Sequence, residues 1–146
     1  RGRSAALNLV ITDTGAAKAI SGILPELKGK ITANAIRVPT PNVSLAIMHL
    51  NIKKGVSVED LNQCFRNAAF HSNLRTTIDY SNSLDAVSSD FYSNEFACVF
   101  DSQATISNFN NITIYCWYDN EYGYSRQVAR LLNKALGINL VRYPRQ

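Results

Sequence analysis

The sequence predicts an α+β domain: a mixed, mostly antiparallel sheet with helices packed on one of its faces, plus a C-terminal helix. Segments rich in β-branched and aromatic residues alternate with segments whose apolar residues recur at helical spacing. Clusters of Pro, Asn and Gly separate these segments. A chain of 146 residues can bury about 68–70% of the surface that its unfolded form exposes. We therefore expect one sheet of at least five strands, with helices on one face.

The first predicted helix covers residues 14–24. Its apolar residues fall on one side of the helix, as expected for an element that packs against a sheet. Pro25 ends the helix, because proline cannot continue its hydrogen bonding. Asp13 or Thr14 can cap its N-terminus.

Two β-rich segments and a second helix follow. Residues 31–39 and 43–53 are separated by the break Pro39-Thr-Pro-Asn42. We therefore expect either two neighbouring strands or one long strand with a bend. Ser57-Val-Glu-Asp60 is a capping-box-like start for a helix that continues to His71.

The second half of the chain predicts more strands and the closing helix. Short strand candidates lie at residues 76–80 and 87–91. Three antiparallel strands with short turns are expected at residues 96–101, 104–108 and 112–118. The closing helix runs from about Tyr122 to Leu136, and Gly137 is placed to stop it.

Charge and hydropathy limit the classes of function. The formal net charge of +4 favours an anionic partner, but the basic residues are dispersed and form no block like a nucleic-acid tail. Nucleic acid is therefore an unlikely partner. The sequence has no run of about 18 apolar residues, so we expect no membrane span.

The cysteines and histidines form no recognisable catalytic or metal-binding pattern. Cys64, Cys98 and Cys116 are odd in number, far apart and without a CxxC pair, which argues against disulfides and zinc. Their apolar neighbours predict buried, unreactive thiols, and a reducing cytoplasm suits them. His49 and His71 lie near neither a cysteine nor a serine at catalytic spacing, so we expect no bound metal.

Two features of the first half predict anion binding. Thr14 and Gly15 open a helix with a hydroxyl and free backbone amides, which is a natural site for a phosphate. Arg37 lies inside an otherwise apolar strand, where a buried or half-buried guanidinium needs an anionic partner. That partner is either internal, such as Asp13 or Asp90, or a ligand.

Several segments, in order, make the chain resemble the C-terminal catalytic domain of glyceraldehyde-3-phosphate dehydrogenase. They are Thr14-Gly-Ala-Ala-Lys-Ala19, Leu24-Pro-Glu-Leu-Lys-Gly-Lys30, Arg37-Val-Pro-Thr-Pro-Asn-Val-Ser44, Val87-Ser-Ser-Asp-Phe91 and Trp117-Tyr-Asp-Asn-Glu-Tyr-Gly-Tyr-Ser125. The resemblance implies a phosphorylating aldehyde dehydrogenase of glycolysis that oxidises glyceraldehyde 3-phosphate with NAD and inorganic phosphate. It leaves NADP open, because the residue that reads the ribose lies outside this chain.

The resemblance also implies residue roles. Thr14 with Gly15 would bind the attacking inorganic phosphate, and Arg37 would hold the substrate phosphate. Arg1 would contribute to phosphate binding, with Arg3 as an interface alternative. Asn120 would hold the nicotinamide carboxamide, since an amide offers both a donor and an acceptor, and Tyr124 would pack near that ring.

The same resemblance implies that the chain is catalytically incomplete. The family's nucleophilic cysteine and its activating histidine precede the position of Arg1, so none of this chain's cysteines or histidines matches them. Residues 1–121 would form part of a catalytic domain, and residues 122–146 a helix and tail that pack on the missing dinucleotide-binding domain. We expect the fragment alone to be inactive and its parent to be a homotetramer.

Two departures from the family and three alternatives stay open. Asp13 stands where the family more often has a small hydroxyl residue, and the tail after Gly137 has no assigned role. The chain could instead be a non-catalytic assembly domain, a part of an erythrose-4-phosphate-type dehydrogenase, or a basic nucleic-acid binder supported only by its charge.

Overall fold

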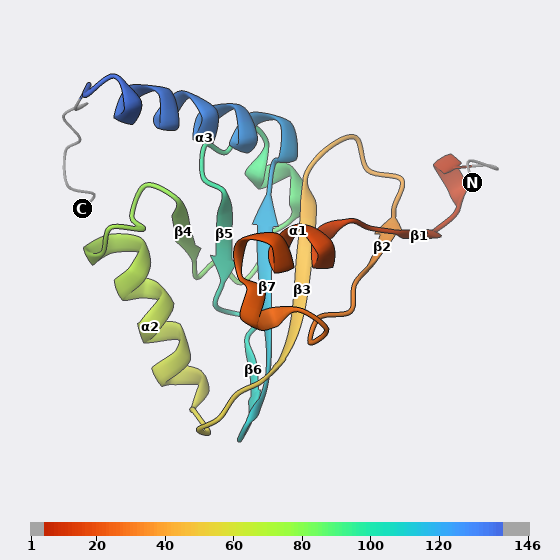
Figure 1. Cartoon of the computed structure of the whole chain (residues 1–146). Helices are drawn as coiled ribbons and strands as arrows, with labels where there is room; N and C mark the ends of the chain where they lie inside the picture. Colours follow the sequence, from red (N-terminus) through yellow and green to blue (C-terminus); the bar gives the residue numbers. More distant parts are fainter. Residues whose placement is uncertain (1–4, 139–146) are drawn as a thin grey trace. The chain divides into compact units, whose positions relative to one another are not determined.

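The computed structural model describes residues 5–138. The chain forms two compact units, Arg1–Pro41 and Asn42–Gln146. Residues 5–138 contain three α-helices and seven β-strands, which are labelled in Figure 1. The predicted α+β class is confirmed, with a mixed five-stranded sheet in the second unit and a two-stranded antiparallel sheet in the first.

The first unit is an antiparallel pair of strands, connected through an α-helix and a short 3-10 helix. Its elements are η1 (Ala5–Leu7), β1 (Val10–Asp13), α1 (Ala16–Ile23), η2 (Pro25–Leu27) and β2 (Asn34–Arg37). β1 and β2 pair antiparallel, with Val10 opposite Arg37 and Asp13 opposite Asn34. The helix predicted at residues 14–24 is confirmed. None of residues 6–41 is buried.

The pairing of β2 corrects the prediction for residues 31–39 and 43–53. β2 pairs with β1, whereas β3 (Ser44–Asn51) pairs with β7 (Asn111–Tyr118), so the two segments are neither neighbours nor one bent strand. β1 is only four residues long and was not predicted. Val43, directly before β3, has a φ of 69°, and β3 lies in the other sheet.

The second unit holds the larger sheet. Besides β3 and β7, its elements are α2 (Val58–His71), β4 (Ile78–Ser81), η3 (Ser88–Phe91), β5 (Cys98–Asp101), β6 (Ile106–Asn108) and α3 (Asn120–Ala135). The strand order is β3-β7-β5-β4, and β6 also pairs with β7. Only the β4–β5 pair is parallel, so the sheet is mixed and mostly antiparallel, as predicted.

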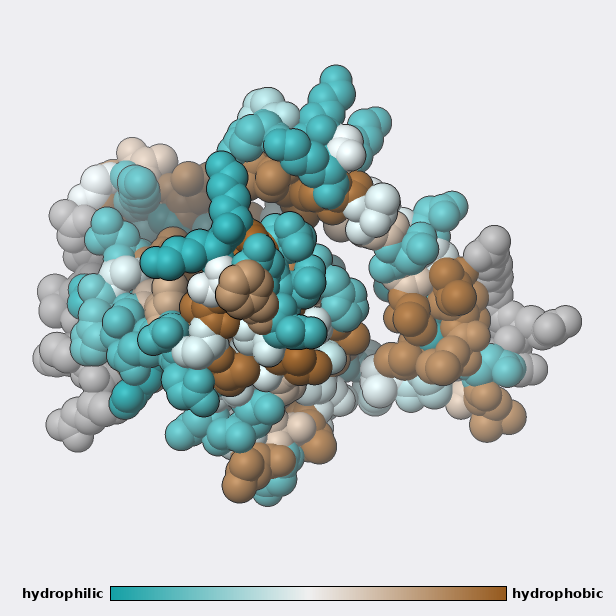
Figure 2. Space-filling view, turned by 90° about the horizontal axis from the view of Figure 1, so that it is seen from below, coloured by the Kyte–Doolittle hydropathy of each residue, from teal (hydrophilic) through white to brown (hydrophobic). Residues whose placement is uncertain are grey.

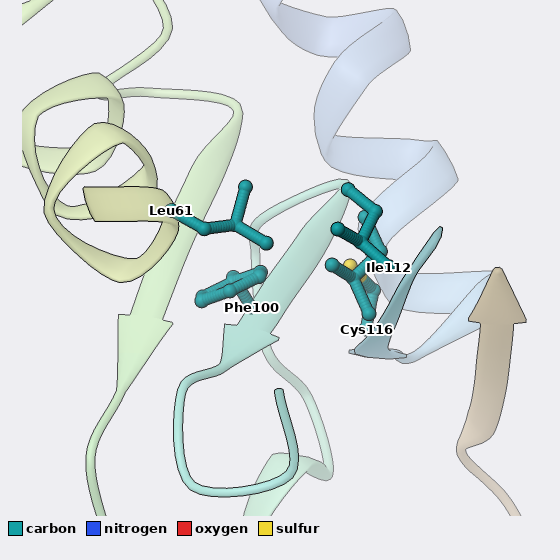
Figure 3. Close-up of a cluster of buried hydrophobic side chains, with 5 residues drawn as sticks. Leu61, Phe100, Ile112 and Cys116 are labelled. Atoms are coloured by element: carbon teal, nitrogen blue, oxygen red, sulfur yellow. The ribbon is translucent and has the colours of Figure 1, made fainter. Parts of the chain in front are cut away.

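The core of the second unit lies between α2 and one face of this sheet. Figure 3 shows Leu61 of α2 against Phe100 of β5, with Ile112 and Cys116 of β7 beside them. Phe100 is fully buried, and the ring of Phe65 stacks on it at a centroid distance of 4.0 Å. The apolar spacing of α2 therefore buries the helix face that the sequence predicted.

Residues 87–91 form a 3-10 turn instead of the predicted strand. The carboxylate of Asp90 accepts a hydrogen bond from the Val87 N–H at 2.9 Å, and the Asp90 N–H donates to the Val87 carbonyl at 3.0 Å. These short-range bonds satisfy backbone groups that a strand would offer to a neighbour. The turn buries Phe91 and stacks its ring on Trp117, with centroids 5.2 Å apart.

The predicted N-cap of α2 and the predicted stop of α3 are confirmed, whereas α1 has Gly15 as its N-cap instead of Asp13 or Thr14. Ser57 caps α2 by accepting from the Asp60 N–H at 3.0 Å. At the end of α3, Gly137 adopts a φ of 69°, and the Ile138 N–H reaches back to the Asn133 carbonyl at 2.8 Å. No helix within residues 5–138 is long and apolar enough to span a membrane.

Candidate functional site

Thr14 and Gly15 lie at the junction between β1 and α1. Gly15 is the N-cap residue, and the Thr14 hydroxyl oxygen accepts from the Ala16 N–H at 3.3 Å. The first helical bond runs from the Ala19 N–H to the Gly15 carbonyl at 2.9 Å. The amides of the preceding helical residues therefore have no intrahelical acceptor. This junction can offer a hydroxyl proton and backbone N–H groups to an anion.

Asp13 does not cap α1. It is the last residue of β1, is exposed and lies opposite Asn34. Residues directly opposite each other share a face of an antiparallel pair, and the faces alternate along each strand. Asp13 therefore lies on the face of the β1–β2 sheet away from Arg37, which lies opposite Val10.

Arg37 is exposed at the end of β2, which corrects the expectation that it is buried. The internal pairing with Asp13 is also wrong, because the two residues lie on opposite faces of the sheet. Asp90, the other expected partner, accepts from the N–H of Val87 in its own turn. Within the described part of its own unit, Arg37 has no ion pair, so its guanidinium is available to an anion from outside.

Asn120 and Tyr124 lie on the first turns of α3, and the helix start is fixed by Asp119. Asp119 is the N-cap, and its Oδ1 accepts from the Tyr122 N–H at 3.0 Å. Asn120 is exposed, and its side chain makes no hydrogen bond with another residue of 5–138. Tyr124, one turn further on, is 71% exposed. Both side chains are therefore accessible.

The Asp119 carboxylate is buried but stays ionised readily. Burial opposes its ionisation, but hydrogen bonds from the Tyr122 and Ser93 N–H groups and from the Asn42 amide outweigh that effect and lower the pKa of Asp119. Sequence reasoning missed this residue. The signal was present, because Asp119 precedes a helix and lies three residues before Tyr122, at N-cap spacing.

One face of α3 packs against the segment before β5, and another face is exposed. Gly123, Arg126, Gln127 and Arg130 lie along the contact face. Gln127 donates to the Glu95 carbonyl at 3.2 Å, and the Arg130 guanidinium lies 5.8 Å from the Phe96 ring centre. The apolar residues Tyr124, Val128, Leu131 and Leu132 are exposed.

The cysteines differ in burial. Cys64 is exposed, so the prediction of a buried thiol is wrong there, because it lies on the solvent side of α2. Cys116 is buried, and Cys98 is half-buried. A hydrogen bond with Cys98, followed by burial, raises the pKa of Cys116. Residues 5–138 contain no group of three His, Cys, Asp or Glu side chains that could hold a metal.

The predicted site residues are divided between the two units and the undescribed N-terminus. Arg1 and Arg3 lie outside the described residues. Thr14, Gly15 and Arg37 belong to the first unit, and Asn120 and Tyr124 to the second. The roles predicted for these residues stay predictions.

Comparison with known proteins identifies close relatives. Residues 1–120 match the family model described as "Glyceraldehyde 3-phosphate dehydrogenase, C-terminal domain". A glyceraldehyde-3-phosphate dehydrogenase-like protein of Pseudomonas aeruginosa is 52% identical over 99% of this chain and 32% of its own length. The chloroplastic glyceraldehyde-3-phosphate dehydrogenase B of Pisum sativum is 46% identical, over 90% of this chain and 29% of its own length. The chain thus spans about a third of the length of these curated relatives.

Proposed function

This chain belongs to the glyceraldehyde 3-phosphate dehydrogenase family, and from that premise we propose that it supplies the phosphate-binding residues and the nicotinamide end of a phosphorylating aldehyde dehydrogenase. The parent enzyme would oxidise glyceraldehyde 3-phosphate with inorganic phosphate to an acyl phosphate, as in glycolysis. A four-carbon aldehyde phosphate is the alternative substrate.

The observation that carries the proposal is the exposed guanidinium of Arg37, which has no ion pair within the described part of its own unit. It is exposed at the end of β2, on the face of the sheet that Asp13 does not share. A guanidinium binds phosphate oxygens in two places and keeps its charge at any working pH. The phosphate of the substrate would therefore be the anionic partner of Arg37, which the described part of the first unit does not supply.

Thr14 and Gly15 suit a second, separate phosphate. Val10 lies opposite Arg37. Asp13, which directly precedes Thr14, lies three residues further along β1, or about 10 Å from Val10 at strand spacing. This backbone separation leaves room for one anion at each site. The hydroxyl and amides at the start of α1 would bind inorganic phosphate, while Arg37 binds the phosphate of the substrate.

Asn120 and Tyr124 fit the nicotinamide end of a dinucleotide. The Asn120 amide has a donor and an acceptor, is exposed and is not used by the described residues, which matches the needs of a carboxamide. NAD, or NADP as the alternative, would accept the hydride when bound. Tyr124 would cover the ring from one helical turn away.

The chain alone would not catalyse the reaction. No hydrogen bond joins a cysteine to a histidine within residues 5–138: Cys98 and Cys116 are hydrogen-bonded to each other, and His49 pairs with the Thr113 hydroxyl at 3.0 Å. We expect the purified chain to form no NADH from glyceraldehyde 3-phosphate, NAD and phosphate. NADH production by the chain alone would contradict the proposed division of the site.

A cytoplasmic location stays a prediction from its unpaired cysteines.

The decisive experiment compares phosphorylated and unphosphorylated aldehydes in the full-length enzyme that carries this chain. Arg37→Ala should lower kcat/KM for glyceraldehyde 3-phosphate by an amount equivalent to about 1.5–3 kcal/mol per charged hydrogen bond lost. The same variant should leave kcat/KM for glyceraldehyde unchanged. Arg66→Ala, which removes an exposed arginine of α2, is the matched control. Equal kcat/KM values for wild type and Arg37→Ala on the phosphorylated substrate would exclude the assignment.

The exposed apolar surfaces favour a second function, assembly with other copies or domains. Val128, Leu131 and Leu132 are exposed on α3, and in a parent tetramer they would be covered by the dinucleotide-binding half. Light scattering of the chain tests this function. A strict monomer across a wide concentration range would count against it.

A further inference from the structure

Three separate segments of the second unit meet at the carboxylate of Asp119. Its Oδ2 accepts from the Ser93 N–H at 2.9 Å and from the Asn42 side-chain amide at 3.0 Å. Its Oδ1 accepts from the Tyr122 N–H at 3.0 Å. Asp119 is only 3% exposed. The loop after η3, the segment before β3 and the start of α3 are thus joined through one side chain.

Two of the joined segments have a backbone conformation that is unfavourable for their residues. Val43 has a φ of 69° and Ser93 a φ of 57°, both in the left-handed region. A β-branched residue rarely adopts this conformation, and it persists only where the surroundings hold it. The Asn42 side chain accepts from the Val43 N–H at 2.7 Å while it donates to Asp119. The same hydrogen-bond network therefore holds both unusual turns.

The network fixes the backbone on both sides of Asn120. Asp119 precedes it, and Tyr122, whose N–H is bound to Asp119, follows it by two residues. The Asn120 side chain itself is exposed and makes no hydrogen bond with the described residues. Its direction therefore depends on the backbone that Asp119 holds.

We propose that Asp119 is a positioning residue that aims the Asn120 amide at the nicotinamide carboxamide through this network. The inference rests on the proposed role of Asn120. A carboxylate is required because all three neighbours donate: two backbone N–H groups and one side-chain NH₂. An asparagine would place its own NH₂ against at least one of these donors and break the network.

The test measures two ligands on the full-length enzyme that carries this chain. NAD contains the nicotinamide, whereas ADP-ribose lacks it and shares the rest of the molecule. Asp119→Asn should weaken NAD binding by up to about ten-fold, the upper end of the effect of losing one hydrogen bond between neutral amides, and leave ADP-ribose binding within about two-fold. Ser57→Ala is the matched control, because it removes the N-cap of α2 in the same unit. It should change neither dissociation constant.

Asn120→Ala separates this inference from the proposed function. If that variant leaves the ratio of the two dissociation constants unchanged, the proposed role of Asn120 fails. If Asn120→Ala changes the ratio but Asp119→Asn leaves it unchanged, the positioning role is overturned. The same holds if Asp119→Asn weakens the binding of NAD and of ADP-ribose equally. Should Asp119→Asn fail to fold, Asn42→Ala removes a single donor from the network. It should shift the ratio in the same direction, and an unchanged ratio would overturn the inference.

Discussion

The ionised state of Asp119 couples the start of α3 to pH. Burial opposes its charge, but the hydrogen bonds that it accepts from Tyr122, Ser93 and Asn42 lower its pKa in the folded protein. Because the folded pKa lies below the unfolded value of about 3.9, the carboxylate stabilises the fold above that value. This contribution is lost as the pH falls through the folded pKa.

We expect Asp119→Asn to lower the urea midpoint of unfolding at pH 7 and to lower it equally at pH 5. Below about pH 4 the difference from wild type should shrink, because the wild-type carboxylate becomes protonated and loses its advantage. Asp85→Asn is the comparison: the Ser83 hydrogen bond lowers the pKa of Asp85 too, but Asp85 is exposed, so its variant should lower the midpoint at pH 7 by less than Asp119→Asn does. A difference between wild type and Asp119→Asn that does not vary with pH would exclude the charge as its cause.

The three cysteines should react with a thiol reagent in a fixed order. Cys64 is exposed, Cys98 is half-buried and Cys116 is buried with a raised pKa. Because reagents attack an accessible thiolate, Cys64 should be labelled first and Cys116 last in the native chain. Peptide mapping after brief labelling gives the order, and Cys64→Ser should remove only the fast phase. Equal labelling of all three in native buffer would contradict the described burial.

Single residues show where sequence reasoning fails for a physical reason. The roles of Ser57 and Gly137 follow from contacts within a few residues, so the sequence predicts them correctly. The exposure of Arg37 and Cys64 depends on which strand or helix face turns outward. Neighbours along the chain do not reveal that. The Asp119 network joins residues as far apart as Asn42 and Asp119, and no local pattern marks such a contact.

At the scale of the element, α3 approaches the backbone of the segment before β5 closely at Gly123. A Cβ added there would lie 2.8 Å from the Phe96 carbonyl oxygen, which is backbone and cannot rotate away. Arg126 and Gln127 bind Glu95 on the same face, at 2.6 Å and 3.2 Å. Glycine at this position therefore lets the helix pack against the segment before β5.

We expect Gly123→Ala to destabilise the second unit, although alanine has the higher helix propensity. The propensity gain of about 0.8–1.0 kcal/mol is smaller than the cost of overpacking against a fixed backbone atom, typically about 1–3 kcal/mol. Ser125→Ala, at an exposed position of the same helix, should be neutral or slightly stabilising. Urea unfolding followed by the fluorescence of Trp117 compares the two variants. A stabilised Gly123→Ala variant would contradict the close approach.

The elements that were predicted wrongly are short. β1 has four residues, and residues 87–91 contain a β-branched valine and an aromatic ring but form a turn closed by Asp90. The long elements α2, β3, β7 and α3 were predicted at nearly their observed positions, because their periodicity extends over at least eight residues. Residue pattern alone indicated anion binding at Thr14, Gly15 and Arg37, whereas the roles of Asn120 and Tyr124 came only from the family resemblance.

On the scale of the whole molecule, the two units differ in how much they bury. The second unit has a core around Phe100, Ile112 and Ile114. The first unit has no buried residue between 6 and 41. Figure 2 shows hydrophobic residues gathered on the surface of the first unit, among them Leu7, Leu9, Ile11, Ile23, Ile36 and Val38. A unit of this size without a core needs another surface to be stable.

Limited trypsin digestion should therefore distinguish the units. Lys18 of α1 and Arg66 of α2 are both exposed helical sites, but α2 buries Leu61 and Ala69 whereas α1 buries no residue. We expect cleavage after Lys18 well before cleavage after Arg66, because cleavage requires local opening and the opening of α1 disrupts no core. In the full-length enzyme, where another domain can cover the apolar residues of the first unit, cleavage after Lys18 should slow while cleavage after Arg66 changes little. Mass spectrometry of the early peptides measures both rates. Cleavage after Arg66 first in the isolated chain would show that the first unit is the more stable of the two.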